Sequence, residues 1–221
     1  MVVSRGGARV PVVLLAAAVA WSITGAPRVA LAASPAPAAL DDSEKADVVR
    51  IEAYLSGVGT MQARFLQTTS EGRYSEGAIY LSRPGRMRID YDPPVPIEIV
   101  ATGRALVFHD RKLEQVSYLG LDSTPASILL AETVQLSGRV TIVDFERGPG
   151  AVAVTLVSTD DAGEGSITLV FSDRPLELRK WVIIDAQGVT TTVSLLGARF
   201  GMDIDPELFE FDDPYFARDP D

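Results

Sequence analysis

Residues 77–91 have the sequence GAIYLSRPGRMRIDY and predict a β-hairpin. In 78–83 and again in 87–91, apolar side chains recur at every second position, which is the period of a strand with one buried face. Between the two segments stand Pro84 and Gly85, which favour the backbone angles of a turn. This stretch therefore indicates antiparallel β structure.

The same period continues on both sides of the hairpin. Upstream, Met61, Ala63 and Phe65 occupy one face of a predicted strand. Downstream, short alternating segments are separated by turn signals such as Thr102-Gly103. About eleven short strands without strand–helix–strand alternation predict an antiparallel meander. The further strands are expected at 96–101, 105–109, 114–118, 139–145, 151–158, 166–172, 176–185 and 189–196.

Two segments depart from the strand period. Val48, Ile51 and Leu55 recur at helical spacing after candidate N-cap residues at 41–43, which predicts a helix that ends near Gly57. Its charged residues are expected to face away from the core: Glu44, Asp47, Arg50 and Glu52. A second, short apolar helix is expected over 125–131 in the middle of the meander, because Pro125 loses no hydrogen bond at a helix start.

The N-terminus has the features of an export signal. Arg5 and Arg9 precede an apolar run over 10–20, which is too short to span a bilayer but suits a secretory signal. The small residues at 30–32 offer a cleavage site. We expect a cleaved signal peptide at 1–32, a flexible leader at 33–40 and one domain at 41–221, in a periplasmic protein.

Composition limits the classes of function. Cleavage would remove three arginines, leaving 17 basic against 30 acidic residues, a net charge of −13. Such a balance disfavours binding to nucleic acid and to anionic membrane surfaces, because both would repel the chain. The chain has no cysteine, so it cannot form disulfides or be acylated at a signal-peptide cysteine.

The residue combinations that enzymes need are mostly missing. The single histidine, His109, is expected on the surface at a strand end, and no G-x-S-x-G motif accompanies it. Without cysteine or a second histidine, the chain has no cysteine nucleophile and no multi-histidine zinc site. The acidic residues of the C-terminal tail are expected to be solvated. We therefore predict no catalysis, no metal and no cofactor.

Periodicity alone leaves two architectures open. A filled β-sandwich or barrel and a half-barrel with a concave apolar face would show the same alternation. Only the second would offer a pocket for an apolar ligand.

Several segments resemble the LolA family of periplasmic outer-membrane lipoprotein carriers. The main one is 77–91, which is similar to the family's G-x-[aliphatic]-[aromatic]-x-x-R-P strand motif. Two positions depart from the family: Ile89 stands where tryptophan is frequent, and Thr102 stands where aspartate is usual. The other similar segments are 61–67 for the first strand, 102–108 for a hairpin, 125–130 for a lid helix and 209–211 for a closing strand.

The resemblance implies an incomplete, strongly curved antiparallel β-barrel closed by an N-terminal helix and a short lid helix. In the family, an arginine at the position of Arg83 donates hydrogen bonds to lid carbonyls and holds the closed state. Since Arg83 shares a strand face with Ile79 and Leu81, its guanidinium would need acceptors inside an apolar region. The residues expected to line the lipid site are Met61, Phe65, Ile79, Leu81, Met87, Ile89, Tyr91, Ile99, Phe108, Ile128 and Leu129.

The function that the resemblance implies is carriage of acylated lipoproteins. The expected partners are an inner-membrane lipoprotein-releasing ABC transporter and, at delivery, an outer-membrane acceptor or the outer membrane itself, with the carrier acting as a monomer. The alternative is a related periplasmic lipid-binding or lipoprotein-sensing module.

Overall fold

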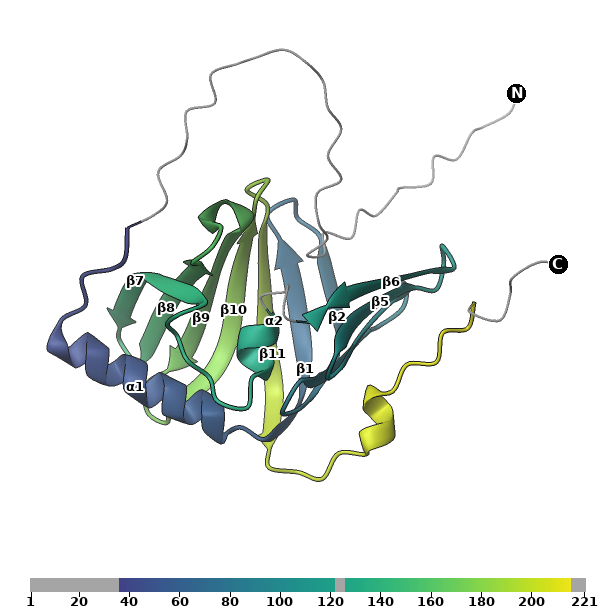
Figure 1. The fold of residues 1–221 in the computed structure, drawn as a ribbon, viewed down its shortest axis with the longest axis horizontal. Helices are drawn as coiled ribbons and strands as arrows, with labels where there is room; N and C mark the ends of the chain where they lie inside the picture. The colour runs from purple at the N-terminus through teal and green to yellow at the C-terminus, as the bar shows by residue number, and fades with distance from the viewer. Residues whose placement is uncertain (1–35, 122–125, 216–221) are drawn as a thin grey trace, which may run out of the picture. The chain divides into compact units, whose positions relative to one another are not determined.

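Eleven antiparallel strands form one open, curved sheet in the computed structural model, which describes residues 36–121 and 126–215 (Figure 1). The strand order is β6-β5-β4-β3-β2-β1-β11-β10-β9-β8-β7, so the first and last strands pair in the middle of the sheet. The strands are β1 (Thr60–Thr69), β2 (Tyr74–Ser82), β3 (Arg86–Tyr91), β4 (Ile97–Thr102), β5 (Ala105–Asp110), β6 (Gln115–Gly120), β7 (Val140–Gly148), β8 (Ala151–Ser158), β9 (Gly165–Ser172), β10 (Glu177–Asp185) and β11 (Thr190–Phe200).

The predicted fold class is confirmed: the protein is mainly β, with a long curved sheet that does not close. The expected strands are present, although β2 begins at Tyr74, before the expected start, and β11 continues to Phe200. The extensions are Tyr-Ser-Glu-Gly at 74–77 and Gly-Ala-Arg-Phe at 197–200, which pair with β1 although neither shows the apolar alternation that predicts a strand.

The helix α1 (Asp42–Gly57) lies across one face of strands β7 to β10 (Figure 1). Asp41 and Glu44 form a capping box that satisfies the first amides of the helix. Ile51 and Leu55 are buried against side chains from β8 and β9, such as Phe171. This helix therefore closes the core of the second half of the sheet, as its helical period predicts.

Asp47 corrects one expectation about α1. It was expected to face solvent, but only 7% of its surface is exposed. Arg147, from the inner face of β7, and Arg50 both form ion pairs with its carboxylate. A buried carboxylate is tolerated only when it is paired, and these two guanidinium groups supply the pairing.

The second helix, α2 (Ala126–Leu130), precedes β7 and is only five residues long. Pro125, its expected first residue, and the side chain of Ile128 lie outside the described part of the chain. Among the described residues, no helix has the length and apolar character that a membrane crossing requires.

The C-terminal segment differs from the closing strand that the resemblance implies at 209–211. It forms instead a short 3₁₀-helix, η3 (Pro206–Phe209), with Asp205 as its N-cap. Pro206 has no amide hydrogen to give to a strand ladder, which favours the helical turn. Phe209 is 3% exposed and packs near β3 and β4, so the segment is anchored to the sheet.

At the N-terminus, the expected signal peptide at 1–32 lies outside the described residues. Of the expected leader, residues 36–40 are described. There the amide of Ala38 donates a hydrogen bond of 2.8 Å to the carbonyl of Ile142 on the edge strand β7. A second short helix, η2 (Ala162–Glu164), connects β8 to β9.

Candidate functional site

The inner face of strands β1 to β5 is a continuous apolar surface. Directly paired residues of neighbouring strands project from the same face of a sheet, so the strand register assigns each side chain to a face. By this criterion all the predicted lining residues on strands share one face. The paired rows are Met61, Leu81 and Met87; Phe65, Gly77 and Tyr91; and Ile79, Ile89, Ile99 and Phe108.

These residues differ in burial. Met87, Ile89, Tyr91 and Phe108 are partly exposed, as is Leu129 of α2. The partly exposed residues lie mainly on β3 and β5, away from the centre of the sheet. The fully buried residues are Met61, Phe65, Ile79, Leu81 and Ile99.

Gly77 allows two aromatic rings to meet on this face. The rings of Phe65 and Tyr91 pack edge to face with centroids 5.2 Å apart. A β-carbon on Gly77 would collide with the backbone carbonyl oxygen of Asp90 and would lie 2.6 Å from the Phe65 ring, so no other residue fits there. The Tyr91 hydroxyl donates to Gln67 at 2.8 Å, and burial raises the pKa of Tyr91 to about 12, so this polar atom stays neutral and satisfied.

Two hydrogen bonds from the β2–β3 turn hold the end of α2. The Arg83 Nε donates to the carbonyl of Leu129 at 2.7 Å, and the amide of Gly85 donates to the carbonyl of Leu130 at 2.8 Å. The last carbonyls of a helix have no partner within it, so they are available as acceptors. We call α2, held in this way, the lid helix.

The segment that follows the lid helix is tied to α1. The amide of Val134 donates to Ser56 Oγ at 3.0 Å, and the amide of Leu136 donates to Glu52 Oε1 at 2.7 Å. The side chains of Val134 and Leu136 are buried in the core under α1. The attachment of this segment to α1 was not predicted from the sequence, although the alternation of apolar and polar residues at 134–137 could have indicated it.

Arg83 is an unneutralised cation beside the apolar face. Burial lowers its pKa to about 10, so it remains charged at neutral pH. Within the described residues, its Nη1 atom is buried and has no hydrogen-bond acceptor. The guanidinium therefore keeps donor capacity that the lid helix does not use.

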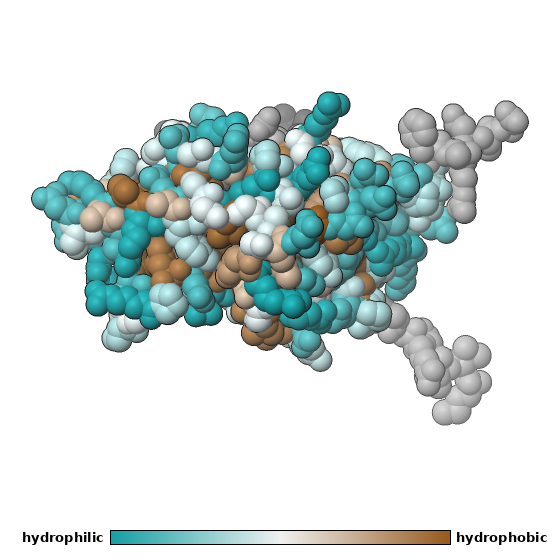
Figure 2. All heavy atoms as spheres, turned by 90° about the horizontal axis from the view of Figure 1, so that it is seen from below, coloured by the Kyte–Doolittle hydropathy of each residue, from teal (hydrophilic) through white to brown (hydrophobic). Residues whose placement is uncertain are grey.

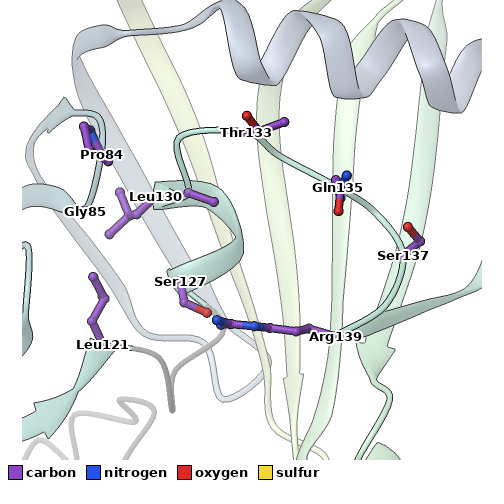
Figure 3. Close-up of a pocket in the computed structure, with 10 residues that line it drawn as sticks. Pro84, Gly85, Leu121, Ser127, Leu130, Thr133, Gln135, Ser137 and Arg139 are labelled. Carbon is purple, nitrogen blue, oxygen red and sulfur yellow. The ribbon is translucent and has the colours of Figure 1, made fainter.

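A cavity of about 370 Å³ lies between the β2–β3 turn, the lid helix and the segment at 131–139 (Figure 3). Leu121 and Leu130 give it an apolar side, while hydroxyl, amide and guanidinium groups line the rest. None of the predicted lining residues whose side chains are described borders this cavity. Its polar lining consists of Ser127, Thr133, Gln135, Ser137 and Arg139.

His109 lies on the opposite face of strands β4 and β5, and it is buried where the sequence predicted a surface position. This side chain is 7% exposed, because the C-terminal segment covers it. Its ring packs against Phe211 and Tyr215, with centroids 5.5 and 5.8 Å away. Its Nδ1 lies 3.4 Å from the carboxylate of Glu98, the directly paired residue on β4.

Glu98 is the centre of a polar cluster on this opposite face, formed with His109, Arg88 and Arg111. Burial alone would raise its pKa, but a hydrogen bond from Arg111 and the charges of Arg88 and Arg111 outweigh burial, so the pKa is lowered. The cluster faces away from the lid helix and holds the C-terminal segment through a bond from Arg88 to the Leu208 carbonyl at 3.3 Å. We interpret it as a structural cluster.

The surface seen from below is mostly hydrophilic, with hydrophobic side chains gathered in small separate groups (Figure 2).

Several known proteins are similar to this chain. The family described as "Outer membrane lipoprotein carrier protein LolA" matches residues 56–212. An outer-membrane lipoprotein carrier protein of Methylococcus capsulatus is 33% identical over 174 residues, covering 75% of this chain and 83% of that protein. One from Alkalilimnicola ehrlichii is 31% identical over 179 residues, covering 77% and 80%. A solved LolA superfamily structure from Nitrosomonas europaea is 11% identical, covers 74% of this chain and 97% of that chain, and has a TM-score of 0.46.

Proposed function

The chain belongs to the LolA family of outer membrane lipoprotein carrier proteins, and from that premise we propose that it carries acylated lipoproteins across the periplasm. It would take them from an inner-membrane releasing ABC transporter and deliver them to an acceptor in the outer membrane or to that membrane itself. The carrier would act as a monomer, without catalysis.

One observation carries this proposal. The inner face of β1 to β5 is apolar over five strands, and next to it lies a helix of five residues held by hydrogen bonds to its terminal carbonyls. A surface of this size suits acyl chains, and a short helix is easily displaced because it has few contacts to lose.

The energetics of transfer explain why a cover is useful. An acyl chain of about 15 methylenes gains roughly 12 kcal/mol when it leaves water, at about 0.8 kcal/mol for each methylene. A carrier that kept all of this free energy could not release its cargo. If opening the lid helix costs free energy, net affinity falls by that amount, and release becomes feasible.

In this scheme Arg83 stabilises the protein without cargo by keeping the lid helix on the apolar face. Its bond to the Leu129 carbonyl and the bond from Gly85 to the Leu130 carbonyl must both break before the lid helix can leave the apolar face. Closing the lid helix again restores both bonds, which offsets part of the cost of expelling the acyl chains.

The test is the identity of the bound material. The exported protein, purified from a periplasmic extract without detergent, should copurify with acylated lipoproteins that mass spectrometry identifies by their lipid-modified N-terminal peptides. A preparation that carried only phospholipid or free fatty acid would contradict lipoprotein carriage and favour the alternative of a lipid-binding or sensing module.

A further inference from the structure

We propose that Arg83 also recognises the cargo directly, by donating hydrogen bonds to the carbonyl oxygen where an acyl chain joins its anchor. This inference rests on the proposed function, because it assigns the polar contact made by a bound acyl chain. It gives Arg83 a role in the loaded protein, in addition to holding the lid helix when the site is unloaded.

The position of Arg83 fits such a contact. Its backbone is fixed, since its amide donates to the carbonyl of Gly59 at 2.8 Å. Its side chain follows Ile79 and Leu81 on the same strand face, so the guanidinium lies at the end of the apolar surface. A chain that occupied this surface would therefore end beside the guanidinium.

The hydrogen bonds that Arg83 makes indicate which kind of ligand atom it can bind. Its Nε contacts a neutral carbonyl oxygen, that of Leu129, while Nη1 is buried without an acceptor in the described part of the chain. When the lid helix leaves, Nε loses its acceptor as well. A guanidinium without acceptors is unfavourable away from water, so an acyl chain that covers Arg83 and excludes water has to bring an oxygen to this place.

An acyl group brings that oxygen with it. By definition the hydrocarbon chain is joined through a carbonyl, which is the same kind of acceptor as the peptide carbonyl of Leu129. Exchange of one carbonyl for another would preserve the Nε bond, and the unused Nη1 could donate to the same or a neighbouring ester. The ligand class is thus an acyl ester or amide, and an alkyl ether should be a poor substitute.

The experiment compares two synthetic lipopeptides that differ in one respect. Both carry the same peptide and two sixteen-carbon chains on a glyceryl-cysteine, one set joined by esters and the other by ethers. Their affinities for the wild-type exported protein are measured by competition against a common fluorescent ligand. The ether form loses a hydrogen bond from a charged donor. We therefore expect it to bind about tenfold more weakly than the ester form.

Two variants show whether Arg83 causes this preference. In Arg83→Leu the two lipopeptides should bind within about twofold of each other, because neither finds a donor. Arg86→Leu is the matched control: it removes the same charge from an exposed position at the start of β3, next to the same turn, and should keep the full preference. Thermal unfolding without ligand confirms that both variants are folded, and the comparison on the wild-type protein needs no variant.

The outcomes separate the two proposals. Equal binding of ester and ether forms by the wild-type protein would overturn this inference and leave carriage intact, as would a preference that survives in Arg83→Leu. Failure to bind either lipopeptide would overturn the proposed function. A matched pair of diacyl and dialkyl phosphatidylethanolamines tests the other source of esters, and a preference confined to that pair would overturn the assignment to lipoproteins.

Discussion

The helices α1 and α2 cover the same face of the sheet, yet they are attached in different ways. The longer one has 16 residues, a capping box and buried side chains such as Ile51 and Leu55. The lid helix has five residues and one fully buried large side chain in its described part, Leu130, and the turn that contains Arg83 holds two of its backbone carbonyls. Apolar burial contributes several kcal/mol for each large side chain, whereas a hydrogen bond contributes about 1 kcal/mol. Because α1 buries more large side chains than α2, we expect α1 to stay in the core and α2 to be the helix that is more easily displaced.

The largest effect should come from the core under α1. We expect Ile51→Ala to lower the free energy of unfolding by about 2–4 kcal/mol, because it leaves a cavity under a fully buried side chain. Chemical denaturation measures this change. Val49→Ala in the same helix is the control, since Val49 is 65% exposed, and similar losses for the two variants would show that α1 is not anchored as described.

A smaller loss should follow from the buried ion pairs. Asp47→Asn leaves Arg147 and Arg50 without their shared carboxylate, and we expect a loss of about 1–2 kcal/mol, since both guanidinium groups are partly exposed to water. Asp42→Asn in the exposed first turn should change stability by less than about 0.5 kcal/mol in the same denaturation assay. An unchanged midpoint for Asp47→Asn would mean that the pairs contribute nothing.

Acid should weaken α1 before it affects the Arg83 bond. A hydrogen bond from the Glu44 amide lowers the pKa of Asp41, so this carboxylate adds stability above its unfolded pKa, and that contribution is lost as pH falls through the lower, folded value. Hydrogen exchange should therefore show the α1 amides losing protection between about pH 5 and about pH 3. Asp41→Asn keeps the cap without the charge and should reduce this pH dependence. Identical profiles for the two proteins would exclude Asp41 as a cause.

The smallest change in stability should come from Arg83. Arg83→Leu loses the bond to Leu129 but also removes a buried, unneutralised cation, so the free energy of unfolding should change by less than about 1 kcal/mol. Its effect should appear in function instead, as slower release of bound lipoprotein to membranes. Release at the wild-type rate, measured against Arg86→Leu, would show that the arginine does not hold the lid helix.

Much of the fold follows from local patterns in the sequence. The alternation at Met61 and Ile79 and the helical spacing of Ile51 predict their elements, because each pattern reports which side of one element is buried. The R-P motif placed Arg83 beside a lid, and the structure has its Nε on a carbonyl of α2.

What the sequence did not predict depends on segments that are distant in the chain. Asp47 is buried because Arg147 arrives from β7, 100 residues later. His109 is buried because the segment around Phe211 packs over it. In both cases the covering partner cannot be deduced from the period of the covered strand or helix. The ties of Val134 and Leu136 to α1 were missed for the same reason.

The pairing of β1 with β11 in the middle of the sheet has a mechanical consequence. It leaves β6 and β7 at opposite edges, and the chain that joins those two edges is the segment that contains the lid helix. Any flattening of the sheet must lengthen the span that this connection covers, and any tightening must slacken it. We therefore expect a partner that bends the sheet from its outer surface to shift the lid helix without touching it.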